Sequence, residues 1–107
     1  MIYVVTNVEA LHGHRDELLA AIERRLTVVR TRPGCIACDV GTPMSTPILV
    51  QEHFDRDVLT VVSQWKDFDY YLAHRNCPEL CGRFAESRHL IVHVETRILE
   101  PGLLSNS

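Results

Sequence analysis

The chain has 107 residues, of which 46% are hydrophobic and 23% are charged, and its formal net charge is −3. This length suits one domain around one core, and the charge argues against both a disordered chain and the basic surface of a nucleic-acid-binding protein. No stretch approaches the roughly 20 apolar residues that span a bilayer. We therefore expect a cytoplasmic protein with neither a nucleic-acid partner nor a membrane partner.

The first half of the chain predicts a strand, a helix and a second strand. Residues 2–9 alternate in polarity and are rich in β-branched side chains, which favours a strand with one buried face. From His14 onward, apolar residues recur every three or four positions, which predicts an amphipathic helix. Its acidic start and basic end, with Arg24, Arg25 and Arg30, match the helix dipole. The apolar stripe of this helix comprises Leu18, Ile22, Leu26 and Val29.

Two breaks separate this helix from the strands that follow. The helix ends at Arg32-Pro33-Gly34, because the residue before a proline avoids the helical region and glycine permits the turn. Residues 35–40 predict the second strand. Glycine and prolines over residues 41–47 then indicate a bulge or a loop, after which an extended pattern resumes over residues 48–54.

The second half predicts a strand, helical segments and a last strand. Residues 58–65 form the most strand-like run of the chain. Asp67 can cap a helix whose apolar side carries Phe68, Tyr71 and Leu72. Pro78 begins a further helical segment that ends near Ser87. Residues 89–99 alternate strictly and predict the closing strand, with one face made of Leu90, Val92, Val94, Thr96 and Ile98.

The order β-α-β-β-α-β predicts an α+β protein with a ferredoxin-like fold, in which helices cover one face of an antiparallel sheet. We expect this domain to span residues 1–103 and a loose tail to follow over residues 104–107. The strands carry apolar residues on both faces, so one helical layer leaves apolar sheet surface exposed. A two-fold homodimer that pairs the sheets face to face, a dimeric α/β barrel, would cover that surface.

The cysteines and histidines raise the question of a metal site. Two disulfides or one zinc site are conceivable for Cys35, Cys38, Cys77 and Cys81. Residues three apart on a strand point to opposite faces, so Cys35 and Cys38 should not meet at one metal. His89 and His93 share a strand face with Glu95 but lie too far apart for easy chelation. We expect no metal site and buried, reduced thiols.

Several motifs together carry a resemblance to a known family. They are Arg32-Pro33-Gly34-Cys35 after the helix, Gln64-Trp65 at a strand end, His74 nine residues later, Pro78, and the ending Arg97-Ile98-Leu99-Glu100-Pro101-Gly102. In this order and spacing the chain resembles the antibiotic biosynthesis monooxygenase family from Ile2 to about Leu103. The proline-broken stretch after Cys35 and the ending are most similar to the quinol monooxygenase branch.

The resemblance implies a dimer of ferredoxin-like protomers with a pocket between sheet and helices. It also implies oxidation of a small aromatic substrate, a quinol or polycyclic phenol, by O2 without a bound cofactor. This chemistry is possible because a deprotonated phenol is itself the reductant, so the protein needs only a base, an apolar cavity and donors for the oxyanion.

The chain also departs from the family pattern. Ser63 stands where many members have a glutamate, and Glu79 stands where many have a histidine. Both departures weaken the transfer of catalytic roles more than the transfer of fold. A haem-degrading branch shares an asparagine at Asn7, but His74 and Arg83 replace its tryptophan and its axial histidine, which argues against haem degradation.

We expect six site residues on these grounds. The candidates for catalysis are His74, Tyr71 and Trp65, and the candidates for substrate binding are Asn7, His53 and Arg83. An unperturbed imidazole titrates near neutral pH, which suits His74 to proton transfer. Asparagine is disfavoured within a strand, so Asn7 invites a functional explanation.

Structural roles compete with each of these assignments. Trp65 and Tyr71 could be core packing, and His74 could lie on the helix surface or against a dimer partner. A bond across the sheet would explain Asn7, and solvent exposure would explain His53 and Arg83. Two further functions stay open, namely an isomerase of small metabolites that uses His74 as its base, and a non-catalytic dimeric binding module.

Overall fold

The computed structural model describes residues 1–48, 57–77 and 87–102. In these residues a short 3-10 helix, η1, accompanies the strands and α-helices. The elements in chain order are β1 (Ile2–Ala10), α1 (Arg15–Val29), β2 (Cys35–Gly41), β3 (Val58–Trp65), α2 (Phe68–Arg75), η1 (Arg88–Leu90) and β4 (Ile91–Leu99). Within the same ranges no helix is long and apolar enough to cross a membrane.

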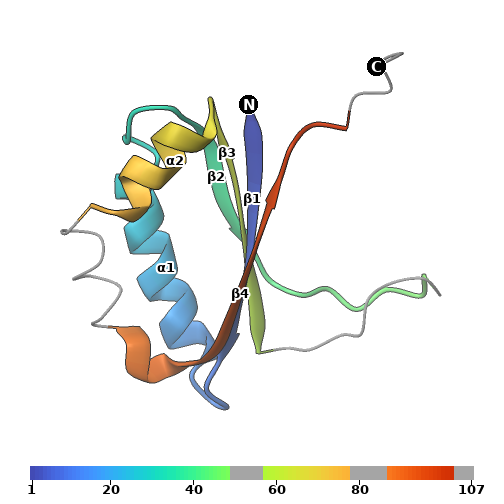
Figure 1. The fold of residues 1–107 in the computed structure, drawn as a ribbon. Helices are drawn as coiled ribbons and strands as arrows, with labels where there is room; N and C mark the ends of the chain where they lie inside the picture. The colour runs from blue at the N-terminus through green and yellow to red at the C-terminus, as the bar shows by residue number, and fades with distance from the viewer. Residues whose placement is uncertain (49–56, 78–86, 103–107) are drawn as a thin grey trace.

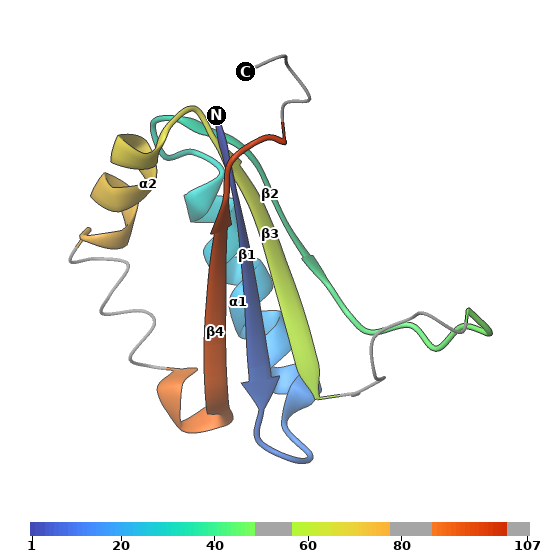
Figure 2. The same ribbon diagram turned by 45° about the vertical axis from the view of Figure 1, so that its right-hand side comes forward.

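The four strands form one antiparallel sheet in the order β2-β3-β1-β4. Both helices lie on the same side of this sheet, as Figures 1 and 2 show, and the opposite side is left open. This two-layer arrangement is the ferredoxin-like α+β fold that the order of elements predicts. The prediction of the fold class is therefore confirmed.

The core lies between the sheet and α1 and has two parts. One part joins β1, β2 and β3 to the second half of α1, and Trp65, only 1% exposed, is its largest side chain. The other part lies around Leu18 and Leu59, near the start of α1. The predicted stripe of α1 is confirmed, because Leu18, Leu26 and Val29 are buried and Ile22 packs against both parts.

Strand β2 contains a bulge that corrects the expectation for two cysteines. Cys35 pairs with Trp65, but Ala37 pairs with Gln64, so the register shifts between Cys35 and Ala37. Cys38 then lies opposite Ser63. The extra residue in the bulge moves every following side chain of β2 to the other face of the sheet. Cys35 and Cys38 therefore lie on the same face, toward the helices, and do not point to opposite faces.

The last strand begins later than the alternation predicts. Arg88–Leu90 forms η1, and β4 starts at Ile91 instead of residue 89. Leu90 is buried beside Leu18 and Leu59, and its carbonyl accepts a hydrogen bond from the Leu11 amide at 2.7 Å. The chain therefore turns into the core before it joins the sheet.

Other predictions divide between described and undescribed residues. Asp67 caps α2, because its side chain accepts a hydrogen bond from the Tyr70 amide at 3.1 Å. Ile48 lies in an irregular stretch, and the rest of the extended pattern predicted to residue 54 lies outside the described residues. The helical segment predicted from Pro78 lies outside them as well, except for its end near Ser87.

Two glycines with positive φ provide a matched test of backbone packing. Gly34 has a φ of 82°, and a Cβ on it would lie 2.2 Å from Cγ of Tyr70. Gly13 has a φ of 83°, and nothing lies within 4 Å of such a Cβ. The turn after α1 thus requires glycine for its conformation and for the close approach of Tyr70.

We expect Gly34→Ala to destabilise the protein by about 2–4 kcal/mol, since the left-handed conformation costs roughly 1 kcal/mol and the clash adds overpacking strain. Gly13→Ala should incur only the conformational cost, so it should destabilise the protein by about 1 kcal/mol. Urea unfolding followed by circular dichroism measures both. Equal losses would mean that Tyr70 does not pack against Gly34.

Candidate functional site

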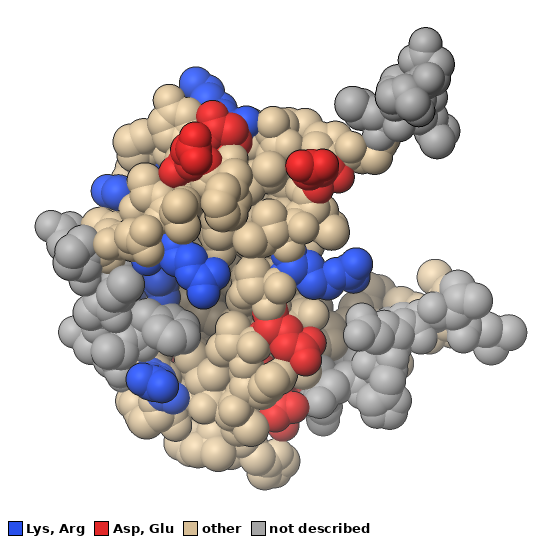
Figure 3. Space-filling model, in the orientation of Figure 1, with Lys and Arg blue, Asp and Glu red and all other residues tan. Residues whose placement is uncertain are grey.

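A cavity of about 630 Å³ lies between the sheet and the helices. Strands β1, β3 and β4 supply one wall, and α1 and α2 supply the other. Figure 3 shows a hollow between the two layers, with Lys and Arg side chains beside it. Aliphatic side chains such as Val4, Val8 and Ile22 form the largest group in the described wall, beside hydroxyl groups, His74 and several arginines. A cavity of this size and character suits an aromatic molecule of modest size.

All three candidates for catalysis meet at one end of this cavity. The ring of Trp65 stacks on that of His74, with centroids 4.9 Å apart and planes 28° apart. Tyr71 meets Trp65 edge to face, with centroids 5.8 Å apart, and its ring lies 6.4 Å from that of His74. The structure therefore brings Trp65, Tyr71 and His74 together as an aromatic cluster that lines the cavity.

The local sequence explains this cluster. Trp65 ends β3 and shares the face toward the helices with Leu59 and Ser63, because side chains alternate along a strand. Tyr71 and His74 are three residues apart on α2, which places them on one side of that helix. The strand end and the helix are joined directly by the Asp67 cap, so the geometry follows from short-range structure.

Electrostatics correct one expectation for His74. Burial, followed by the positive charges of Arg25 and Arg32, lowers the pKa of His74 from 6.5 to about 4. The imidazole is therefore neutral at pH 7 instead of titrating there. Its Nδ1 is buried and has no hydrogen-bond partner among the described residues. A neutral ring with an uncommitted nitrogen can exchange a hydrogen bond with a ligand.

Ser63 joins the cluster as a polar group that the sequence interpretation treated only as a missing glutamate. Its Oγ accepts a hydrogen bond from Trp65 Nε1 at 3.0 Å, and the residue is buried and lines the cavity. A hydroxyl that accepts one hydrogen bond keeps its own proton for donation. Ser63 can therefore donate to an oxygen atom of a ligand in the cavity.

Arg25 is a second residue that the sequence interpretation missed. It follows Ile22 by three positions and precedes Val29 by four, so it stands in the inward stripe of α1 and lines the cavity. A charged residue in such a stripe is rare unless it is paired or functional. The spacing was the available signal, but the arginine was assigned to the helix dipole.

Of the three candidates for substrate binding, Asn7 lies in the described residues, and it is not part of this cluster. Asn7 faces the open side of the sheet, where its Oδ1 accepts a hydrogen bond from Thr60 Oγ1 at 2.7 Å. This cross-strand bond gives the structural explanation for a mid-strand asparagine. His53 and Arg83 lie outside the described residues.

The thiols have the properties of packed apolar groups. Burial raises the pKa of Cys38 to about 11 and also raises the pKa of Cys35. Cys35, Cys38 and Cys77 are free, and in the described part of the chain no cluster of His, Cys, Asp or Glu could hold a metal ion. On β4, His93 Nε2 lies 2.9 Å from Glu95 Oε1, which gives this histidine a carboxylate partner.

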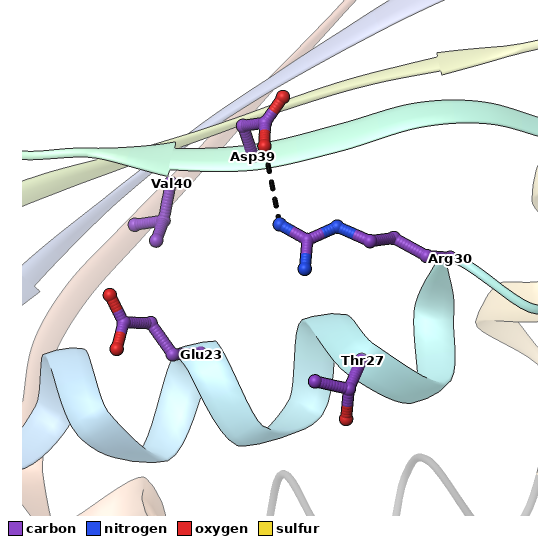
Figure 4. A pocket seen from close by; sticks show the side chains of 5 residues that line it. All are labelled: Glu23, Thr27, Arg30, Asp39 and Val40. Atoms are coloured by element: carbon purple, nitrogen blue, oxygen red, sulfur yellow. Dashed lines mark hydrogen bonds and ion pairs between the residues drawn. The ribbon is translucent and has the colours of Figure 1, made fainter.

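A second depression, of about 410 Å³, lies between α1 and β2 (Figure 4). Arg30 dominates it, because its Nε donates to the Cys38 carbonyl at 2.8 Å and its Nη2 lies 3.2 Å from Asp39 Oδ1. These bonds attach the end of α1 to the edge strand. They give the depression a structural role.

Comparison with known proteins agrees with this geometry. The sequence model of the antibiotic biosynthesis monooxygenase family matches residues 1–80. No curated protein matches the sequence.

Similar solved structures come from several bacteria. A protein from Deinococcus radiodurans is 17% identical with a TM-score of 0.79, over 100% of this chain and 98% of that chain. Rv0793 from Mycobacterium tuberculosis is 19% identical with a TM-score of 0.76, over 98% of both chains. SnoaB, a cofactor-independent oxygenase from Streptomyces nogalater, is 14% identical with a TM-score of 0.74, over 99% of this chain and 97% of that chain. At such low sequence identity, these structural similarities establish the fold and nothing more.

Proposed function

Because the chain belongs to the antibiotic biosynthesis monooxygenase family, we propose that it is a cofactor-independent monooxygenase that oxidises quinols or related polycyclic phenols with O2. The observation that carries the proposal is the meeting of Trp65, Tyr71 and His74 in a cavity of about 630 Å³ whose largest group of lining residues is aliphatic. An aromatic cluster with one imidazole suits a flat phenolic ring.

The reaction balances without any further reductant. A hydroquinone and O2 give a hydroxyquinone and water, so one oxygen atom enters the ring and the other leaves as water. The substrate supplies all four electrons. Loss of the phenolic proton lets the ring pass an electron to O2. The two radicals then join in a C–O bond, and the peroxide formed loses water as its O–O bond breaks and the ring C–H gives up its proton.

The residues of the cluster would have different roles in this reaction. His74, neutral at pH 7, accepts a hydrogen bond or the proton from the phenol. The arginine charges that lower its pKa also stabilise a phenolate, so a weak base suffices. Ser63 and Tyr71 can donate hydrogen bonds to substrate oxygens, and Trp65 can stack on the ring. His53 and Arg83 stay predictions for substrate binding.

The test is O2 uptake by the purified, metal-stripped protein with a panel of hydroquinones and anthrones. We expect uptake above the spontaneous rate, and one labelled oxygen atom in the product when 18O2 is supplied. If O2 uptake persists after metal removal, it comes from the protein and not from a contaminating metalloenzyme. Absence of protein-dependent uptake with every substrate would overturn the proposal and leave the isomerase and the binding module.

We also propose that two protomers pair through the open face of the sheet. Val5 and Val62 lie opposite each other at its centre, and Tyr3 and Leu99 lie beside them. Val62 is 47% exposed and Leu99 is 37% exposed in the protomer. A second copy would bury these apolar side chains and Asn7 in an isologous interface.

We expect Val62→Lys to weaken this dimer at least about a hundredfold, since two-fold symmetry buries the new charge twice. Light scattering after size-exclusion chromatography measures the shift to monomer. Leu11→Lys is the matched control, because Leu11 is 43% exposed but lies in the turn after β1. An unaltered dimer in the Val62 variant would exclude the open face as the interface.

A further inference from the structure

The sheet wall of the cavity carries hydroxyl side chains at two separate places. Ser63 comes from β3, Thr6 from β1 and Thr96 from β4, and all three line the cavity. Ser63 lies opposite Val4, and Thr6 is the next residue of β1 on the same face. Ser63 and Thr6 are therefore diagonal neighbours, whose Cα atoms lie about 7–8 Å apart. Thr96 lies directly opposite Thr6 on the side away from β3.

Thr6 and Thr96 form a hydroxyl pair at one of these places. Their Oγ1 atoms lie 3.4 Å apart, which is long for a hydrogen bond between two hydroxyls. Within the described ranges each of these hydroxyls bonds only to the other. A hydroxyl can donate one hydrogen bond and accept two, so the pair retains an O–H and lone pairs for a ligand. It can accept a hydrogen bond from a ligand hydroxyl or donate one to a ligand carbonyl.

The other place lies at the aromatic cluster and offers a different chemistry. Ser63 Oγ accepts a hydrogen bond from Trp65 Nε1 at 3.0 Å, so the serine keeps its own proton for donation. His74 stacks on Trp65, and its buried Nδ1 lacks a hydrogen-bond partner in the described part of the chain. This nitrogen is an acceptor when the neutral ring carries its proton on Nε2. A phenol oxygen there can give its proton to His74 and accept a hydrogen bond from Ser63.

We propose that the cavity selects aromatic substrates with two oxygen atoms on opposite sides of a ring, one at the aromatic cluster and the other at the Thr6–Thr96 pair. The inference rests on the proposed use of this cavity as the substrate site. It makes Thr6 and Thr96 specificity-determining residues and narrows the substrate from phenols in general to para-dihydroxy aromatics. A hydroxyl pair suits this role, because it can bind the second oxygen as a hydroxyl before oxidation and as a carbonyl afterwards.

Calorimetric titration without O2 tests the inference with 1,4-dihydroxynaphthalene, 1,2-dihydroxynaphthalene and 1-naphthol. The three compounds share one ring system and differ only in the presence and position of the second hydroxyl. We expect the 1,4-compound to bind at least about fivefold more tightly than either of the others, because one neutral hydrogen bond changes an affinity about three- to tenfold. Adjacent oxygens cannot reach both places at once.

Variants of the threonine pair assign this preference to its hydroxyls. Thr6→Val replaces a hydroxyl by a methyl group in a strand that favours β-branched residues, so it should remove most of the preference and leave 1-naphthol unaffected. Thr96→Val should remove less of it, because Thr96 is the more exposed of the two and water competes there. Thr6→Ser keeps the hydroxyl and should keep the preference.

Thr60→Val is the matched control for a hydroxyl lost from the sheet. Thr60 lies on β3 but faces the open side, where it donates to Asn7, so all three affinities should stay unchanged. Circular dichroism checks the fold of each variant. Equal affinity of the wild-type protein for the three compounds, or an equal loss for all three in Thr6→Val and Thr96→Val, would overturn the inference.

The outcome is separable from that of the proposed function. A preference for the 1,4-compound that depends on Thr6, without O2 uptake by any substrate, would keep the two-oxygen site and reject the oxygenase. Protein-dependent O2 uptake without this preference would do the reverse.

Discussion

Replacing Trp65 with alanine should destabilise the protein by about 3–5 kcal/mol, the usual cost of a large aromatic-to-alanine change in a core. Trp65 is 1% exposed, and it packs against β1, the end of α1 and the rings of Tyr71 and His74. A domain of this size has a total stability of roughly 5–15 kcal/mol, so the variant should unfold at a markedly lower urea concentration. Circular dichroism must follow it, because Trp65 is the only tryptophan.

Two milder variants separate packing from hydrogen bonding at this position. Trp65→Phe keeps most of the aromatic bulk but loses the indole N–H. Ser63→Ala keeps the indole but leaves its Nε1 without the Ser63 acceptor, which should cost about 1–3 kcal/mol. A loss below about 1 kcal/mol in Trp65→Ala would show that this side chain is not a core anchor.

Much of the fold could be predicted because it depends on local periods. Alternation over β1 and β3 determines which face of the sheet each side chain lies on, and in the structure Trp65 lies on the face toward the helices. The three-to-four spacing of α1 identifies its buried stripe. A cap residue such as Asp67 acts within one turn, so its role was also visible.

The failures of prediction arise where distant residues compete. The sequence from Cys35 to Ala37 contains no signal of a bulge, because the register of β2 is determined by its pairing with β3. Leu90 fits the alternation of the last strand, yet the core around Leu18 draws it into η1. In both places tertiary packing overrides the alternation of side chains that the sequence shows.

The candidate site shows the same division. Tyr71 and His74 are three residues apart, a spacing that puts two side chains on one side of a helix, and in the structure their ring centroids lie 6.4 Å apart. The protonation of His74 depends first on its burial and then on the charges of Arg25 and Arg32, which lie more than 40 residues earlier, so only the fold reveals it. Asn7 faces away from the cavity because its position in β1 alternates with Thr6, which lines it.

We expect His74→Ala to lower kcat/KM for quinol oxidation at least tenfold, or about 1.4 kcal/mol of transition-state stabilisation. The loss should appear mainly in kcat, because the imidazole acts on the phenolic proton as it leaves, whereas packing of the ring contributes to binding. His74→Gln is the informative companion, since an amide can accept a hydrogen bond but cannot take the proton. A variant with unchanged kcat would exclude His74 from the chemistry.

The pH dependence provides the stricter test of the same residue. Because the pKa of His74 is lowered to about 4, the ring stays neutral through pH 6.5 and becomes protonated only near pH 4. The wild-type kcat/KM should therefore hold through pH 6.5, and the part due to His74 should be lost only as the pH falls through about 4. Stability should follow a different window: the unfolded chain binds the proton first, so folding weakens as the pH falls from 6.5 toward 4.

Arg25→Gln removes one of the charges that hold this pKa down, so it should move the acid limb of kcat/KM to higher pH. Circular dichroism at each pH separates loss of activity from loss of fold. An acid limb near pH 6.5 in the wild-type protein, unmoved in the Arg25 variant, would mean that His74 is solvated as in a free peptide. The arginines of the cavity would then act on the substrate alone.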